Sequence, residues 1–346
     1  MKKLLFVSAL VMAVSASFGQ FFPTDSLIVV QTTQAVSTSS AAAQTNLVGY
    51  NYGGTTNGQN FDLTANSGIT LTGNSSAEGV VTGSTGFLAI AGYSSTVGTA
   101  APSGVAAANR RVAVFNNAGA GSVSFVDVAS TGTSIRSAYT ADGTNILTST
   151  SAGGWRTQTG TTPTVLGTAT NTRAIKEVGG TIYGSTASGT TGGVYTLSGA
   201  TQNLVQRTND ASTSDFDFIK DGAGLAQDYV LVAGSGGLKI FRGFNSVDTS
   251  NIVTTVSTDT LIQNIAVRNW DSNGLKKVTV FASSLTKIYS MTFDAGQIEA
   301  GGLSMTAIAT ASAGSTFRGL EVVPEPASMA ALGLGLAGLA ARRRRK

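Results

Sequence analysis

A short unit recurs six times along the chain and limits the folds that the sequence can adopt. Each copy is a four-residue stretch that begins with a charged or polar residue, and the copies open at Glu78, Arg136, Arg173, Asp215, Asn264 and Arg318. Successive openings are 58, 37, 42, 49 and 54 residues apart. Self-similarity at this spacing is typical of propellers and other repeat architectures, and loop insertions widen the spacing without changing the unit.

The residues after each opening also recur in type. Five copies run into a tight-turn signal and the sixth runs into Pro324; the signals are Gly83-Ser84-Thr85-Gly86, Asp142-Gly143, Gly179-Gly180, Asp221-Gly222 and Asn273-Gly274. Such residues supply the positive φ that two-residue hairpins need. A β-branched or apolar run comes after each turn, and in three copies a Gly pair introduces the next run. We therefore predict that each unit is a four-stranded antiparallel meander, the size of a propeller blade.

The two ends of the chain complement each other. The last copy has only its first strand, residues 317–322, whereas residues 27–31, 47–52 and 69–72 are strand-like runs without an opening unit. Joining them predicts an all-β fold: a β-propeller of about six four-stranded blades, with the N- and C-terminal strands closing the ring and leaving no long unpaired edge. Seven blades would follow if the 58-residue step held an extra one. A pair of β-sandwiches is the alternative, and it does not require the two ends to share a sheet.

Composition excludes several kinds of chemistry. The chain has no Cys and no His, so disulfides, a lipid-modified cysteine, zinc sites and His-dependent triads are excluded. The net charge of +4 comes from the two ends, because residues 20–323 hold 15 Lys and Arg against 17 Asp and Glu. We therefore expect no nucleic-acid partner. No motif for a cofactor is present, and the Gly-rich tracts lack the Lys-Ser/Thr ending of a phosphate loop.

The N-terminus has the parts of a secretory signal. Lys2 and Lys3 precede an apolar run over residues 4–14, and Ser17-Phe18-Gly19 places small residues where a signal peptidase reads them. We predict a signal helix in residues 1–19 with cleavage between Gly19 and Gln20, Ala16 being a second cleavage position. A transmembrane helix is the other interpretation, but the run is too short.

The C-terminus has three parts in a fixed order. Pro324, Glu325 and Pro326 end the folded body, because proline cannot continue a helix or a central strand. Residues 327–341 are apolar or small apart from Ser328, and as a helix they would reach about 22 Å, short of the roughly 30 Å hydrocarbon core. Cations then complete the chain and favour the cytoplasmic side of a membrane; they are Arg342, Arg343, Arg344, Arg345 and Lys346. A hydrophobic terminal helix with a basic cap is the simpler interpretation.

This order of parts resembles the PEP-CTERM sorting signal of bacterial surface proteins. The resemblance implies processing by an exosortase, a membrane protease, after transient inner-membrane anchoring through a short transmembrane helix in residues 324–346. It also implies a final place in the cell envelope, on the outer surface or in the extracellular matrix. The body, residues 20–323, is more loosely similar to the propeller-like ectodomains of some PEP-CTERM proteins, which implies a surface location and no established activity.

The body offers few candidates for chemistry. Asp215 and Asp217 are two apart in an opening strand, so both carboxylates face the same side. They could bind Ca²⁺, share a proton or act as a glycosidase pair, or they could be solvated residues or partners of Arg173 or Arg318. The charged openings, which we expect to lie around one axis, predict either ion pairs between blades or a polar lining for a sugar or small anion. Trp155 and Trp270 are candidates for sugar stacking or for packing.

Two functions remain open at this point. The favoured one is a non-enzymatic, exosortase-processed surface protein whose propeller is a binding or structural module, with extracellular polysaccharide as a candidate ligand. The alternative is an extracytoplasmic polysaccharide hydrolase or lyase that uses carboxylates such as Asp215 and Asp217.

Overall fold

The computed structural model describes most of the body of the chain. The described residues are 22–33, 39–84, 86–104, 109–117, 122–128, 134–158, 163–167, 171–188, 192–199, 201–208, 213–219, 229–242, 252–256, 261–272 and 275–323. The predicted signal helix, its Gly19–Gln20 cleavage site and the terminal segment 324–346 lie outside them. No helix within the described residues is long and apolar enough to cross a membrane.

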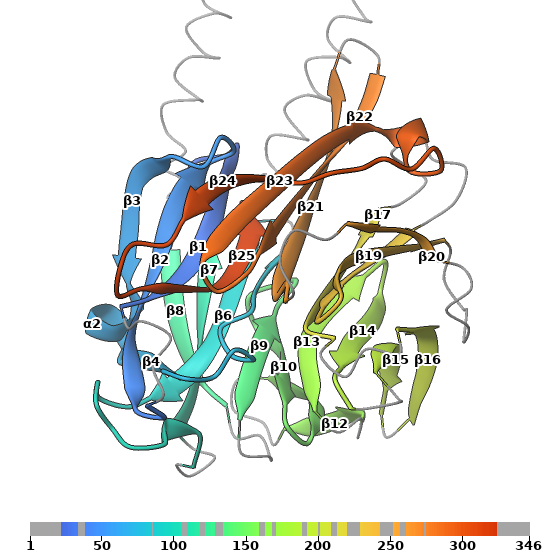
Figure 1. The fold of residues 1–346 in the computed structure, drawn as a ribbon. Helices are drawn as coiled ribbons and strands as arrows, with labels where there is room; N and C mark the ends of the chain where they lie inside the picture. The colour runs from blue at the N-terminus through green and yellow to red at the C-terminus, as the bar shows by residue number, and fades with distance from the viewer. Residues whose placement is uncertain are drawn as a thin grey trace, which may run out of the picture.

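Antiparallel strands make up almost all of the described secondary structure (Figure 1). Four sheets have four strands each. Their strands are β9 (Ile135–Tyr139), β10 (Asn145–Thr150), β11 (Gly153–Gln158) and β12 (Thr164–Gly167); β13 (Thr172–Val178), β14 (Thr181–Thr186), β15 (Gly193–Ser198) and β16 (Thr201–Arg207); β17 (Asp215–Ile219), β18 (Tyr229–Gly234), β19 (Gly237–Arg242) and β20 (Ile252–Val256); and β21 (Asn264–Ser272), β22 (Leu275–Ser283), β23 (Lys287–Asp294) and β24 (Thr306–Thr310). Each sheet pairs its strands in chain order, as predicted for a meander.

A nine-stranded sheet holds the rest. Its order is β25 (Thr316–Val322), β1 (Ser26–Thr32), β2 (Ala42–Asn51), β4 (Ile69–Thr72), β6 (Phe87–Ser94), β7 (Arg110–Asn116) and β8 (Ser122–Asp127), with β3 (Thr56–Asp62) also paired to β2 and β5 (Val81–Ser84) to β6. The series β25-β1-β2-β3 and β5-β6-β7-β8 are therefore two further four-strand meanders. Strand β4 joins them into one sheet.

The role of β4 corrects one prediction. Residues 69–72 were expected to be the third strand beside the N-terminal pair, but that place belongs to β3, and β4 bridges β2 and β6. The short helix α2 (Leu63–Ser67) redirects the chain between them; Asp62 Oδ1 accepts a hydrogen bond from Ala65 N (2.8 Å), and Gly68 ends the helix at φ 69°. The sequence signal for β3 was weak, because this strand is polar and mostly exposed.

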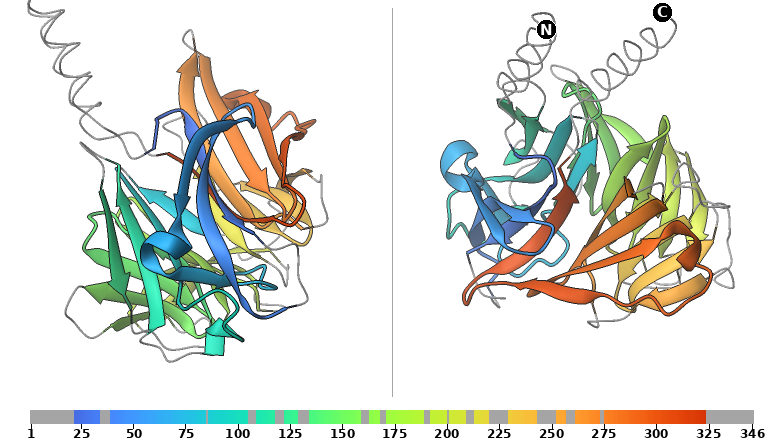
Figure 2. Two further views of the ribbon diagram at one scale, coloured as in Figure 1. Left: turned by 90° about the vertical axis from the view of Figure 1, so that its left-hand side faces the viewer. Right: turned by 90° about the horizontal axis from the view of Figure 1, so that it is seen from above.

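The N- and C-terminal strands pair as predicted. Strand β25 lies antiparallel to β1, from Leu27 opposite Val322 to Thr32 opposite Thr316. Val323 N then donates to Ser26 O at 2.9 Å. Figure 2 shows the red C-terminal strand beside the blue N-terminal strands. The other sheets follow one another between these two ends of the chain in the order of the colour bar. All the described strands lie between residues 26 and 322, so a protein of residues 20–323 retains both closing strands.

The first strand of each meander contacts the first strands of its neighbours. Contacts run from β25 to β5 and then through β9, β13, β17 and β21 back to β25. We call these six the first strands. Strands β5 and β9 run parallel, with Val80 bridged to Ser137. Six apolar clusters lie in the described core, and each joins consecutive meanders; one, for example, packs Leu231 and Ile240 against Val280 and Met291.

Short polar side chains link the first strands to each other. Thr82 Oγ1 donates to Ala138 O (2.5 Å), Ser137 Oγ accepts from Ile175 N (3.0 Å) and Asn264 Nδ2 donates to Arg318 O (2.9 Å). Asp215 and Asp217 do the same between β17 and β21, and Glu321 between β25 and β5. Hydrogen bonds from side chains thus replace a continuous ladder of backbone hydrogen bonds between meanders. Buried Ser, Thr and Asn are frequent in these strands because they supply those bonds.

Candidate functional site

Five of the six opening residues lie within the first three residues of a first strand, and Glu78 lies three residues before β5. Glu78 is buried and accepts hydrogen bonds from Thr72 N (2.8 Å), Thr72 Oγ1 (3.1 Å) and Tyr93 Oη (2.8 Å). Burial raises the pKa of Glu78, although these hydrogen bonds and the charge of Arg318 oppose the shift. Glu78 makes no ion pair within 4 Å among the described residues.

Arg318 and Arg136 act as clamps between meanders. Arg318 is 1% exposed and donates to the backbone oxygens of Gly73 and Ser75, which precede β5. Arg136 donates to Asn171 Oδ1 and to Thr172 O (3.3 Å), at the start of β13. Burial lowers the pKa of each guanidinium to about 10. The predicted inter-blade ion pairs are thus replaced, at these two positions, by bonds from arginine to backbone and amide oxygens.

Asp215 and Asp217 face the same side, as predicted, and their partner is Lys176. Lys176 Nζ lies 3.6 Å from Asp215 Oδ1 and 3.6 Å from Asp217 Oδ2. The suggested partners Arg173 and Arg318 were wrong for this pair. Asp215 Oδ2 also accepts from Ile265 N (3.0 Å) and Asp217 Oδ2 from Val267 N (3.1 Å). Both carboxylates therefore hold β21 in place.

A third carboxylate completes this cluster. Glu321 Oε2 accepts from Gly83 N (3.0 Å) and Glu321 Oε1 from Val322 N (3.0 Å). Burial raises the pKa of Glu321 to about 8; Lys176 opposes the rise, and Asp217 and Asp215 add to it. We call Lys176, Asp215, Asp217 and Glu321 the buried charge cluster. No group of three or more Asp and Glu in the described residues is arranged to hold a metal ion.

The sequence held a signal for this cluster that the opening residues alone did not reveal. Lys176 and Glu321 are the fourth residues of their four-residue units, Arg173-Ala174-Ile175-Lys176 and Arg318-Gly319-Leu320-Glu321. The corresponding residues in three other units are apolar: Val81, Phe218 and Val267. A charged residue at the fourth position of a first strand was therefore the exception that marked the site.

A pocket of about 300 Å³ opens beside the buried charge cluster. It lies at the ends of β5 and β25 and along β21, and its lining includes Asp25, Tyr52, Arg268, Asn269, Glu321 and Val323. Arg268 Nη2 lies 2.5 Å from Asp25 Oδ1, and its guanidinium carbon lies 4.7 Å from the centre of the Tyr52 ring. Phe281 stacks on the same tyrosine, with ring centres 5.1 Å apart. A second hollow, of about 470 Å³ beside Arg156 and Leu197, has a less charged lining.

Of the two tryptophans, Trp155 lies in β11 and is half-buried, and its indole N–H is buried without a hydrogen-bond partner in the described structure. The side chain of Trp270 lies outside the described part of the chain.

The comparisons with known proteins support the interpretation of the C-terminus. A family model described as the PEP-CTERM protein-sorting motif matches residues 322–345. A comparison with curated proteins finds no match. A solved structure of dihydro-heme d1 dehydrogenase NirN in complex with DHE is similar at a TM-score of 0.38 and 10% identity, over 78% of this chain and 52% of that one. The chain thus spans about half the length of that protein. A likeness at this TM-score and identity carries no information about the activity of the present chain. The chain carries a PEP-CTERM sorting motif, which marks it as an exported protein that its C-terminus anchors transiently and that an exosortase sorts to the cell surface or beyond.

Proposed function

We propose that this protein is a non-enzymatic binding module of the cell surface, built as a six-bladed β-propeller and directed at extracellular polysaccharide. The closed series of contacts among the first strands supports the propeller, as does one apolar cluster at each step between meanders. The pairing of β25 with β1 supports closure by the two ends, which a pair of sandwiches does not require.

The proposal includes the handling of both ends. A signal peptidase removes residues 1–19 between Gly19 and Gln20, and the C-terminal segment then holds the protein in the inner membrane. The exosortase acts at or near Pro324-Glu325-Pro326 and releases the body to the envelope or the extracellular matrix. The sorting motif supports the handling of the C-terminus, and the charged and apolar runs of residues 1–19 support their removal.

The pocket lined by Arg268 and Glu321 is the observation that carries the binding proposal. Its volume of about 300 Å³ is at the small end of ligand pockets, which suits a single sugar ring. Its lining combines a guanidinium, a carboxylate and an amide, so it can donate to and accept from hydroxyl groups. Asp215 and Asp217 each accept a backbone N–H and flank Lys176, which supports a structural role for them.

The test is a glycan-array screen of a protein of residues 20–323, and then calorimetry with the strongest ligand. We expect binding without release of reducing ends. Arg268→Gln should weaken the binding about 10-fold or more, since a charge-assisted hydrogen bond contributes about 1.5–3 kcal/mol. Arg156→Gln, beside the other hollow, is the matched control and should bind normally. No binding to any glycan, or equal binding by both variants, would contradict the proposal.

One observation favours the alternative, a polysaccharide hydrolase or lyase. Glu321 lines the pocket with a pKa raised by burial to about 8, as suits a general acid, and Asp217 lies close enough to contribute to that shift. Glycoside hydrolysis uses a carboxylic acid of raised pKa to protonate the leaving-group oxygen. If an array ligand is cleaved and Glu321→Gln abolishes cleavage while leaving binding intact, the enzymatic alternative replaces the binding module.

A further inference from the structure

One of the six opening residues differs from the other five in its contacts. Five of them have hydrogen-bond partners for their side chains: Glu78, Arg136, Asp215, Asn264 and Arg318. The guanidinium of Arg173, in β13, makes no hydrogen bond and no ion pair with any residue that the structure describes, and its Nε is buried. The Nε–H is therefore a buried donor without an acceptor in the described structure, which costs free energy unless a partner binds it.

The guanidinium of Arg136 is held next to the start of β13, because it donates to Asn171 Oδ1 and to Thr172 O, the two residues directly before Arg173. Arg136, in the neighbouring β9, is 8% exposed, and its Nε is likewise buried without an acceptor in the described structure. Burial and the positive charge of Arg173 both lower the pKa of Arg136. The negative charge of Glu78 opposes this decrease, and the pKa of Arg136 still falls to about 10. The guanidinium groups of Arg136 and Arg173 are therefore neighbours, and no carboxylate among the described residues lies within 4 Å of either one.

Solvent can reach this place. Arg173 is only half-buried, whereas Arg318, the clamp at the equivalent position, is fully buried. Arg136 and Arg173 lie at the starts of their strands, and the pocket beside Glu321 lies at the ends of β5 and β25. Because β5 and β9 run parallel, the arginine pair and the pocket are at opposite ends of the first strands.

We propose that Arg173, with Arg136 beside it, forms an anion-binding site that takes a carboxylate, sulfate or phosphate group. The planar guanidinium fork matches the oxygens of these groups and can bind them with two parallel hydrogen bonds. The site is separate from the pocket of the proposed function and does not depend on it. The anion comes either from an acidic saccharide or from a free small anion, and the two sources present the same chemistry.

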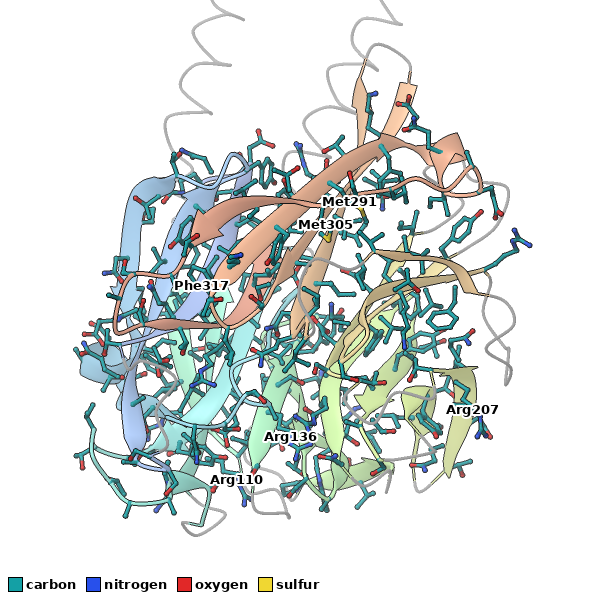
Figure 3. The ribbon with its side chains drawn as sticks, in the orientation of Figure 1. Arg110, Arg136, Arg207, Met291, Met305 and Phe317 are labelled. Carbon is teal, nitrogen blue, oxygen red and sulfur yellow. The ribbon has the colours of Figure 1, made fainter. Side chains whose placement is uncertain are left out.

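The test uses calorimetry on a protein of residues 20–323 with three probes: trigalacturonate, its neutral counterpart galactotriose, and inorganic phosphate. Arg173→Gln should weaken anion binding about 10-fold or more, since one charge-assisted bidentate contact is lost. The matched control is Arg207→Gln, which removes the same charge from the outermost strand of the same sheet, β16, and should bind like the unmodified protein (Figure 3). Binding of trigalacturonate alone identifies an acidic saccharide as the ligand, and binding of phosphate as well identifies a free anion.

Melting temperatures without any anion provide the second readout. Arg173→Gln should melt at the same temperature or higher, because it removes repulsion from Arg136 and breaks no bond in the described structure. A clear fall would mean that Arg173 is structural and would overturn the site. Equal affinity of Arg173→Gln and unmodified protein for the anions would also overturn it. Binding of galactotriose with no anion effect would reject the site while leaving the pocket and the proposed function standing.

Discussion

Buried charges on and beside the first strands are the residue-scale feature that distinguishes this protein from a simple apolar sheet core. Each is held in a different way: Arg318 by backbone oxygens, Glu78 by a hydroxyl pair and an N–H, and Lys176 by two carboxylates. The sequence predicted that Asp215 and Asp217 face one side because strand periodicity is local. It marked Lys176 and Glu321 only as charged exceptions at the fourth position of their units and did not place them beside the aspartates, since those contacts join strands far apart in the sequence.

Glu321 should make the stability of the protein depend on pH. Its pKa is about 8 in the folded protein, raised by burial, against an ordinary value of 4.5. The folded state then binds more protons than the unfolded state between these values, so stability should fall as pH rises from about 4.5 to about 8. Glu321→Gln cannot ionise and should flatten this slope.

Urea unfolding of both proteins at pH 5, 7 and 9 is the measurement. The charged groups that face Glu321 are Lys176, Asp217 and Asp215, so the variant keeps any pH dependence that belongs to the two aspartates. Parallel pH profiles for the two proteins would show that Glu321 is not the group responsible.

At the scale of elements, most strands were predictable because turns and β-branched runs are local signals. Strands β6, β10, β14, β18 and β22 are the β-branched or apolar runs expected after the five turn signals, and Gly143 and Gly180 adopt the positive φ expected of their turns. The sequence did not predict α2 or the linking role of β4, since both depend on how β3 packs against β2. Element boundaries in the polar N-terminal meander were therefore the weakest part of the prediction.

Gly319 controls the approach of β25 to the segment that leads into β5. A Cβ atom at Gly319 would lie 2.1 Å from the backbone oxygen of Gly79, and backbone cannot move aside as a flexible side chain can. We expect Gly319→Ala to separate the closing strand from β5 and to destabilise the protein by several kcal/mol, at the upper end of overpacking costs of about 1–3 kcal/mol or beyond them. Calorimetric melting measures this.

Gly53→Ala is the control for that substitution, because nothing lies within 4 Å of a Cβ at Gly53 and its φ is not positive. It should leave the melting temperature nearly unchanged. If Gly319→Ala behaved like Gly53→Ala, the close contact between β25 and Gly79 would have no role in holding the ring.

On the scale of the whole molecule, the N-terminal strand β1 and the C-terminal strand β25 lie side by side in one sheet. Val323 directly follows β25, and its N–H donates to Ser26 O. The chain then continues into Pro324. The whole of β25 precedes Pro324, so removal of the tail leaves the closing strand in its sheet. The C-terminal segment after Val323 can thus be removed without breaking the pairing of β25 with β1, which suits a protein that is anchored first and released later.

A pair of truncations tests this separation. A protein ending at Val323 should melt like the longer protein, whereas one ending at Ser315 lacks β25 and exposes the edge of β1. We expect the shorter protein to aggregate or to melt at a much lower temperature, as measured by light scattering and circular dichroism. Equal melting of the two truncations would rule out closure by the C-terminal strand.

The tail should act in separate parts. Replacing Pro324-Glu325-Pro326 by three alanines should leave export through the first membrane intact but trap the uncleaved protein there, because the exosortase no longer recognises it. Replacing Arg342 to Arg345 should instead allow the chain to pass through without retention, since these cations hold the tail on the cytoplasmic side. Fractionation of the two variants distinguishes the outcomes, and identical fractionation would contradict a two-part signal.

Transient anchoring and subsequent sorting are tested most directly by the intact mass of surface-exposed protein from a host that carries the matching exosortase. We predict a mature chain that begins at Gln20 and ends at or near the Pro324-Glu325-Pro326 motif, without the residues 327–346. Surface protein that still ends at Lys346 would show that the tail is a permanent anchor and would contradict the sorting pathway.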